Sequence, residues 1–238
     1  MKKLLAAIVT FAMIFCFAAC GSSESAEPAE PEETAGTETV AGGWTIAEDP
    51  AAAELPDDVQ KAMDNFAENY GDDLIPMAYY GNQVVKGMNY GLLCKSKGDN
   101  ELQTVVLEQE PNGNVDGAII NTFKIDEYTQ GDGADPSAEP VDGGWNVAED
   151  YTTTELPDEV QNAFDKATEE FVGNDLVPMA YLGSQVVAGT NYALLCHSTL
   201  VTAEPVSSIQ VVIIYEDLDG NCSIANINTL DLASFSEE

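Results

Sequence analysis

The chain has 238 residues. It contains 8 Lys and Arg residues and 42 Asp and Glu residues, which gives a formal net charge of −34. A protein with this charge repels phosphate backbones and anionic membrane surfaces, so the composition argues against nucleic acid as a partner. The length accommodates one large domain or two small ones.

The first 19 residues have the pattern of a signal peptide, with a basic start, "MKK", and the apolar run "LLAAIVTFAMIFCFAA". This run is too short for a comfortable membrane span. It closes at "FAAC", where small residues before Cys20 resemble the lipobox of bacterial lipoproteins. We expect residues 1–19 to be removed, Cys20 to carry the lipid, and residues 20–41 to form a disordered acidic tether on the outer face of the cell membrane. An ordinary secretory signal, in which Cys20 is incidental, is the alternative.

The remaining chain contains two copies of one sequence, which we call the first repeat (residues 42–128) and the second repeat (residues 143–238). Both begin with "GGW", and over their first 55 or so residues more than half of the aligned positions are identical. Between them, residues 129–142 are rich in Gly, Pro, Ala and Asp, which is typical of a linker. The sequence therefore predicts two tandem domains.

Each repeat contains one predicted amphipathic helix. Apolar residues recur at positions i, i+3, i+4, i+7 and i+11, a proline occupies the first turn, and a glycine marks the end. The stripes are Val59, Ala62, Met63, Phe66 and Tyr70 in the first repeat, and Val160, Ala163, Phe164, Ala167 and Phe171 in the second; the expected helix stops are Gly71 and Gly173.

Four extended runs follow each helix, and Asp219-Gly220 marks the last turn of the second repeat. Tyr192, Leu194 and Cys196 share one parity and should face the helix. We therefore predict an α+β fold with two tandem domains, each an antiparallel sheet of four or five strands wrapped around one helix.

The hairpin between the first two runs reads "NQVVKGMNY" in the first repeat and "SQVVAGTNY" in the second. This string, preceded by a double glycine and a long helix, resembles the cystatin superfamily of cysteine-protease inhibitors, and its second copy is similar to the stefin-type form. The resemblance covers both repeats and implies two cystatin-like domains. It implies inhibition of papain-like cysteine proteases by occlusion of the active site, without cofactor, metal or catalytic residue.

The resemblance assigns protease binding to three segments of each repeat. The third, a second hairpin with an apolar dipeptide in the family, is polar here, "EPNGN" or "DLDGN", with only Pro111 and Leu218 as apolar candidates. Lys86 charges the first tip, which makes the second repeat the expected binder. The implied site residues are Gly143, Gly144, Gln185, Val186, Val187, Ala188 and Gly189 in the second repeat, and Gly42, Gly43, Gln83, Val84, Val85 and Gly87 in the first.

Catalytic patterns are absent from the sequence. His197 is the only His, and Lys95 replaces it in the first repeat, so a catalytic triad or Cys–His pair has little support. Cys94 and Cys196 are expected to be buried apolar residues, while a Cys196–Cys222 disulfide stays open. "DLDGN" faintly resembles a calcium loop, but a polar turn is the better interpretation.

Two functions therefore compete. The first is a lipid-anchored, extracellular inhibitor of papain-like cysteine proteases. The second is a non-inhibitory binding module that uses the same scaffold at the cell surface. The double glycine and "QVVAG" favour the inhibitor, and the polar second hairpin favours the binding module. We expect the inhibitor, and we do not expect an enzyme.

Overall fold

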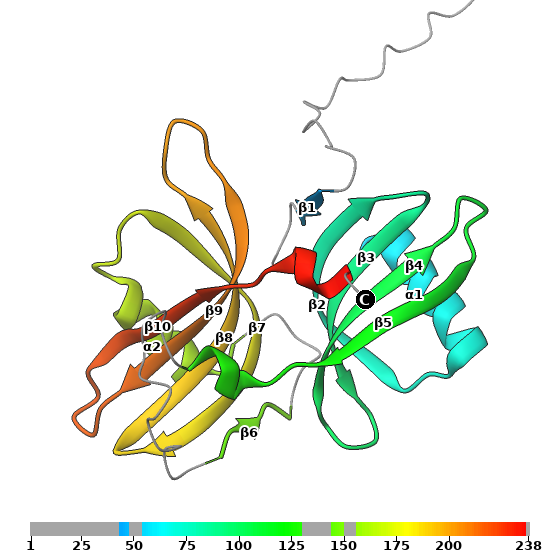
Figure 1. Ribbon diagram of the computed structural model, residues 1–238. Helices are drawn as coiled ribbons and strands as arrows, with labels where there is room; N and C mark the ends of the chain where they lie inside the picture. Colours follow the sequence, from blue (N-terminus) through cyan, green and yellow to red (C-terminus); the bar gives the residue numbers. More distant parts are fainter. Residues whose placement is uncertain (1–42, 48–53, 130–143, 150–155, 237–238) are drawn as a thin grey trace, which may run out of the picture. The chain divides into compact units, whose positions relative to one another are not determined.

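The computed structural model describes residues 43–47, 54–129, 144–149 and 156–236, and residues 38–238 belong to one compact unit. Each repeat forms one sheet of five antiparallel strands (Figure 1). The first sheet has the order β1-β2-β3-β4-β5. Its repeat comprises β1 (Trp44–Ile46), α1 (Asp57–Tyr70), β2 (Leu74–Val84), β3 (Met88–Ser96), β4 (Leu102–Gln109), β5 (Val115–Thr122) and the 3₁₀ helix η1 (Ile125–Tyr128).

The second repeat has the same order of elements along the chain, and its sheet has the order β10-β9-β8-β7-β6. All neighbouring strands in it are antiparallel. Its elements are β6 (Asn146–Val147), α2 (Asp158–Thr168), β7 (Asn174–Val187), β8 (Gly189–Leu200), β9 (Ser207–Glu216), β10 (Cys222–Thr229) and the 3₁₀ helix η2 (Leu232–Ser236).

Both helices start directly after a proline, where a missing N–H costs no intrahelical bond, and both carry two acidic residues in the first turn. Helix α1 ends at Gly71, which has φ 109° and donates its N–H to the carbonyl of Ala67. Helix α2 ends at Thr168, earlier than the predicted stop at Gly173, so Phe171 lies beyond the helix. The predicted stripes are confirmed at the buried positions Val59, Ala62, Met63, Phe66, Val160, Ala163 and Phe164, whereas Ala167 is half-buried and Tyr70 is 55% exposed.

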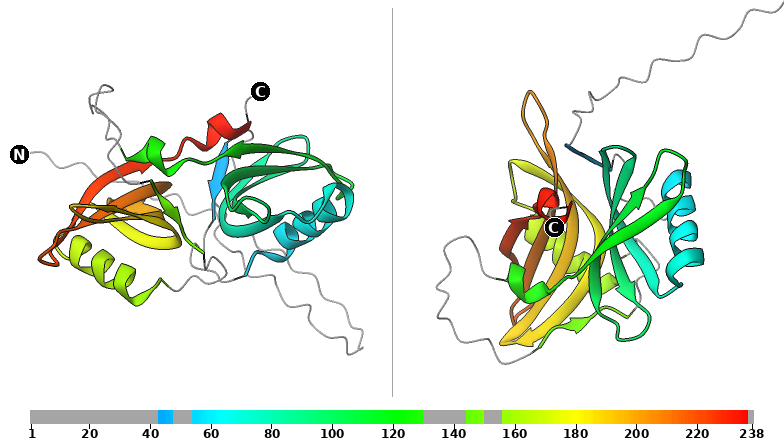
Figure 2. Two further views of the ribbon diagram at one scale, coloured as in Figure 1. Left: turned by 90° about the horizontal axis from the view of Figure 1, so that it is seen from below. Right: turned by 45° about the vertical axis from the view of Figure 1, so that its right-hand side comes forward.

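Each helix covers one face of its own sheet (Figure 2). In the second repeat, Tyr192, Leu194 and Cys196 pack in one buried cluster with the α2 residues Val160 and Phe164, as their shared parity predicted. The first repeat has the equivalent cluster, formed by the α1 stripe with Tyr90, Leu92, Cys94, Val105, Leu107 and Val115.

The other face of each sheet enters a third cluster that contains residues of both repeats. Leu93 and Leu102 belong to it from the first repeat, and Leu195 and Ile213 from the second. The 3₁₀ helices reinforce this packing. The side chains of Asn226 and Asn228 in β10 each donate a 2.7 Å hydrogen bond to the carbonyl of Tyr128 in η1, while Phe235 of η2 contacts Tyr80 of β2.

The predicted α+β fold of two tandem cystatin-like domains is therefore wrong. About half of the described residues lie in strands and only about a fifth in helices, so the chain is mostly β, with two antiparallel five-stranded sheets. The physical reason lies in strands such as "GLLC" and "VVII", which are apolar at both parities. The helix covers the side chains on one face of the sheet. The side chains on the other face are buried in the third cluster, which we call the shared cluster because both repeats contribute to it.

Candidate functional site

The second tip, residues 185–189, comprises the end of β7, Ala188 and the start of β8. Strand pairing continues to Val187 opposite Gly189. Val186 is 73% exposed although its side chain is aliphatic. Gly189 has φ +135°, and a Cβ there would collide with the backbone carbonyl of Glu216. Both the backbone conformation and the space at this turn therefore require glycine.

The first tip, residues 83–87, has a different turn. Its strand pairing ends at Val84 opposite Met88, so three residues form the connection. Val85 is 46% exposed, and Lys86 is exposed and charged beside it. The two tips thus share their frame but differ in shape and charge.

The glutamine of each tip supports the hairpin from within. Gln185 is buried, and its Oε1 accepts a 2.9 Å hydrogen bond from Nδ2 of Asn191. Gln83 and Asn89 form the same bond at 2.9 Å in the first repeat. Sequence reasoning assigned the glutamines to partner binding and missed the two asparagines. The signal was present, because both repeats hold a Gln and an Asn six residues apart around the turn.

The segments after the double glycines lie beside the tips. Trp44 pairs with Gln83, so Gly43 runs level with Val84 one residue further along the antiparallel strands. In the second repeat Asn146 pairs with Ser184, which places Gly144 level with Val186 by the same count. Gly43 and Gly144 are exposed. Gly43 and Gly144, the described glycines of these segments, therefore lie at the same end of each sheet as the tip.

The β9–β10 turn, residues 217–221, completes this end of the second sheet. Glu216 pairs with Thr190 on one side and with Cys222 on the other, so the turn begins next to Gly189. Leu218 in the turn is 85% exposed. In the first repeat, the β4–β5 turn, residues 110–114, begins directly after Gln109. Gln109 pairs with Met88, so this turn lies next to the first tip. Each sheet thus brings all three segments to one end.

The turn at residues 217–221 is ordered by its own aspartate. The Asp217 carboxylate accepts backbone N–H groups of Asp219 and Asn221, and also the Asn221 side-chain amide, at 2.8 to 2.9 Å. These bonds, the side-chain bond from Asn221 first, lower the pKa of Asp217. Among the residues that the structure describes, no group of three or more His, Cys, Asp or Glu is placed to hold a metal ion.

Burial disfavours the charged forms of Cys94, Cys196 and His197. Burial raises the pKa of the Cys94 thiol to about 12 and also raises the pKa of Cys196, so both remain protonated thiols. Burial lowers the pKa of His197, whose Nδ1 lies 3.5 Å from the Thr199 hydroxyl. Cys94, Cys196 and Cys222 are all free thiols.

The disulfide left open between Cys196 and Cys222 is excluded by the register. Cys196 lies opposite Gln210 on β9, whereas Cys222 lies opposite Glu216. Six residues along one strand correspond to roughly 20 Å. A disulfide requires Cα atoms within about 7 Å. The two thiols therefore stay too far apart to form a bond.

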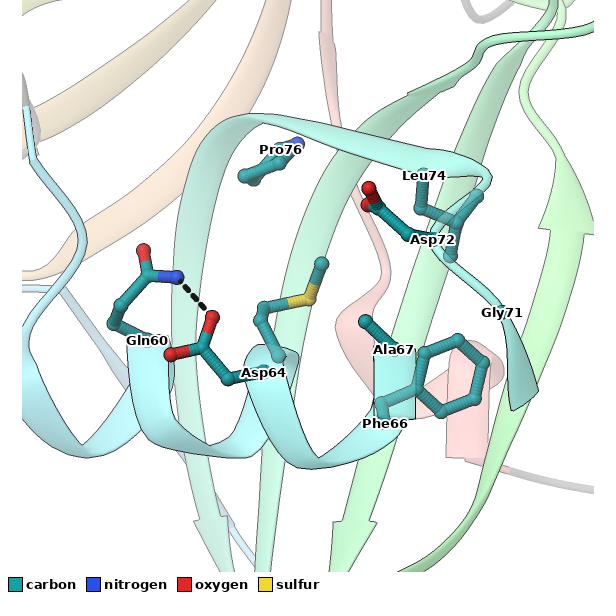
Figure 3. A pocket seen from close by; sticks show the side chains of 9 residues that line it. Gln60, Asp64, Phe66, Ala67, Gly71, Asp72, Leu74 and Pro76 are labelled. Atoms are coloured by element: carbon teal, nitrogen blue, oxygen red, sulfur yellow. Dashed lines mark hydrogen bonds between the residues drawn. The ribbon is translucent and has the colours of Figure 1, made fainter. Parts of the chain in front are cut away.

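Two pockets in the described part of the chain lie away from the tips. One, of about 100 Å³, lies between α1 and β2, where Leu74 and Pro76 face Phe66 and Ala67, and Gln60 donates a 2.8 Å bond to Asp64 (Figure 3). A larger one, of about 490 Å³, is lined by Thr104, Ile119, Asn121, Thr122, Phe123, Glu127, Tyr128, Ser234 and Phe235.

Several predicted features lie outside the described residues. These are the signal peptide, Cys20, the tether, Gly42, Gly143 and nearly all of the linker. The predicted domain boundaries and the lipid anchor therefore stay predictions. In the part of the chain that is described, no helix is long and apolar enough to cross a membrane.

A scan of protein-family models found no match to the chain, and a search of curated proteins found no match either. A function therefore has to be inferred from the residues and the geometry of the tips.

Proposed function

We propose that the protein inhibits papain-like cysteine proteases by inserting the second tip into the substrate cleft. The supporting observation is the register of the second sheet, which brings Gly144, Val186 and the turn that holds Leu218 to one end of the sheet. Val186 and Leu218 are the most exposed aliphatic residues there, at 73% and 85%. The resemblance of "SQVVAGTNY" to the inhibitor signature supports the same assignment.

The energetics of such an insertion favour binding over solvation of the tip. Full burial of a valine or leucine side chain contributes about 1.5–3 kcal/mol relative to exposure. Two aliphatic residues therefore supply several kcal/mol when a cleft covers them. The hairpin is held by paired strands on both sides, so it loses little conformational entropy on docking.

Reversible occlusion follows from the hairpin geometry. Val187 and Gly189 are paired across the turn. The chain therefore reverses direction at the tip and is not extended there. A protease cleaves a substrate that presents a bond in near-attack geometry. A tip that fills the cleft in a folded conformation blocks the enzyme without acylating its nucleophile.

In this proposal a lipid on Cys20 holds the inhibitor at the outer face of the cell membrane, with residues 20–41 as the tether. The acidic tether keeps the repeats away from an anionic membrane surface. Replacement of Cys20 by Ser is expected to move the protein from the membrane fraction to the medium. A membrane-bound Cys20→Ser protein would contradict the anchor.

The test of inhibition uses papain and the full chain without its first 19 residues. We expect Val186→Asp to weaken inhibition at least 100-fold, because a carboxylate enters an apolar contact unpaired. Val85→Asp, the same change at the exposed valine of the first tip, is expected to weaken it less than threefold. Gly189 is a poor test position, because any side chain there distorts the turn itself.

Two outcomes would overturn the inhibitor. One is the absence of papain inhibition by the wild-type chain at micromolar concentration, and the other is equal inhibition by wild type and Val186→Asp. Either result would leave a non-inhibitory binding module, the function favoured by the acidic residues that flank Leu218. Circular dichroism of each variant is the check that the fold is retained.

A further inference from the structure

Tyr215 holds the second tip from the neighbouring strand. It lies in β9 opposite Asn191 of β8, and its hydroxyl donates a 2.6 Å hydrogen bond to the carbonyl oxygen of Ala188. Its ring lies against Gly189, where a Cβ would come within 2.9 Å of the ring. The Tyr215 side chain thus passes over Gly189, which closes the turn, and hydrogen-bonds to Ala188 at the apex.

Among the described residues of the first repeat, the position aligned with Tyr215 does not supply this bond. Glu108 occupies the aligned position, opposite Asn89 in β3. An ionised carboxylate carries no hydrogen to donate to a backbone carbonyl. The turn of the first tip instead closes with a longer bond, 3.3 Å, from the N–H of Val85 to the carbonyl of Gly87. Strand pairing also ends earlier there, at Val84 opposite Met88.

Two other features of the hairpin are shared by both repeats. Each has its Gln–Asn hydrogen bond at 2.9 Å, and each has a glycine after the apex. The phenol is therefore one difference between the two hairpins, beside the charge of Lys86 and the three-residue turn of the first tip. The bond is also directional, because it holds the carbonyl of Ala188 and with it the plane of the Ala188–Gly189 peptide.

We infer that Tyr215 is a positioning residue that pre-organises the second tip and makes it, rather than the first tip, the binding head of the protein. The binding role in this inference rests on the proposed function. The ordering of the tip by Tyr215 does not depend on it. A tip fixed before encounter loses less freedom on docking, so the gain is expressed as slower dissociation from the partner.

The matched pair of variants for the test is Tyr215→Phe and Tyr70→Phe in the full chain without its first 19 residues. Both remove one phenolic hydroxyl that donates to a backbone carbonyl, because Tyr70 donates a 2.7 Å bond to Asp116 in the first repeat. Loss of one such bond changes an equilibrium constant roughly three- to tenfold. We expect Tyr215→Phe to speed amide hydrogen exchange in residues 186–190 by that factor, and Tyr70→Phe to leave it unchanged.

The second readout is papain inhibition followed in time. Tyr215→Phe is expected to raise the dissociation rate three- to tenfold with little change in the association rate, and Tyr70→Phe to change neither. The double variant Lys86→Ala with Glu108→Tyr installs the uncharged apex and the phenol in the first repeat. It is expected to restore measurable inhibition to a chain disabled by Val186→Asp.

The outcomes separate the inference from the proposed function. Unchanged exchange of residues 186–190 in Tyr215→Phe would overturn the positioning role, whatever the inhibition data show. Faster exchange with an unchanged dissociation rate would overturn the link between tip order and binding. Faster exchange in Tyr215→Phe together with no papain inhibition by wild type would retain the ordering of the tip and overturn only the inhibitor.

Discussion

Lys95 of β3 and Ala148, the residue after β6, join the two repeats through a hydrogen bond of 2.6 Å from Nζ to the carbonyl oxygen. Lys95 is only 2% exposed, so the bond is made in the interior. The aligned residue of the second repeat is His197, which is half-buried. The duplication has thus diverged at a position that now links its two halves.

The first prediction concerns this link. We expect Lys95→Met to lower the free energy of unfolding by about 1–3 kcal/mol, because the carbonyl of Ala148 loses a buried donor. Lys97→Met is the control, since its salt bridge with Asp72 is exposed and such a pair is worth less than about 1 kcal/mol. Urea unfolding measures both. A Lys95→Met protein as stable as wild type would show that the desolvation cost of the ammonium offsets the bond.

The second prediction concerns the shared cluster. A fragment of residues 143–238 exposes the sheet face that carries Leu182, Leu195 and Ile213, which is buried in the cluster with the first repeat. We expect the fragment to unfold or self-associate rather than to remain a folded monomer. Size-exclusion chromatography with light scattering and circular dichroism measures this. A monomeric fragment that unfolds as cooperatively as the full chain would contradict the prediction.

The third prediction concerns thiol reactivity. Cys94 and Cys196 are fully buried, and burial raises both of their pKa values, so the reactive thiolate is scarce and inaccessible. Cys222 is partly exposed. We expect iodoacetamide to label Cys222 in the native protein and to label the other two only in urea, as read by peptide mass spectrometry. Native labelling of Cys196 at the rate of Cys222 would contradict the packing under α2.

The fourth prediction concerns alkaline pH. Burial raises the pKa of Tyr79 and of Tyr192 to about 12, from 10.0 in a free side chain. Between pH 10 and 12 the unfolded chain therefore binds fewer protons than the folded one, so the free energy of unfolding falls as pH rises through this window. Urea unfolding at a series of pH values measures the slope. Tyr79→Phe is expected to reduce it, and an unchanged slope would contradict the assignment.

Much of the local structure was predictable because it depends on nearby residues. The helix stripe from Val59 to Phe66 follows from spacing, and the first turn follows from the proline before it. The parity of Tyr192, Leu194 and Cys196 was also read correctly. Val186 was also placed correctly in a hairpin, where it is 73% exposed. Each of these depends on contacts within one element or one hairpin.

The fold class was not predictable in the same way, because it depends on what covers the second face of each sheet. The runs "GLLC" and "VVII" showed apolar residues at both parities, but periodicity does not say whether a helix, a loop or another sheet buries the second set. The shared cluster of the two repeats decided it. The hydrogen bonds that the Tyr128 carbonyl accepts from Asn226 and Asn228 of the other repeat were likewise not predictable from local pattern.

The sequence by itself determined the duplication, the position of the helices and the two hairpin tips, since each is a matter of local pattern and chain order. Only the tertiary structure decided that the tip glutamines are internal supports, that Cys196 and Cys222 are far apart, and that Tyr215 reaches Ala188. Those facts depend on strand register, because a shift of one residue changes which side chains meet, and register is fixed by packing across the whole sheet.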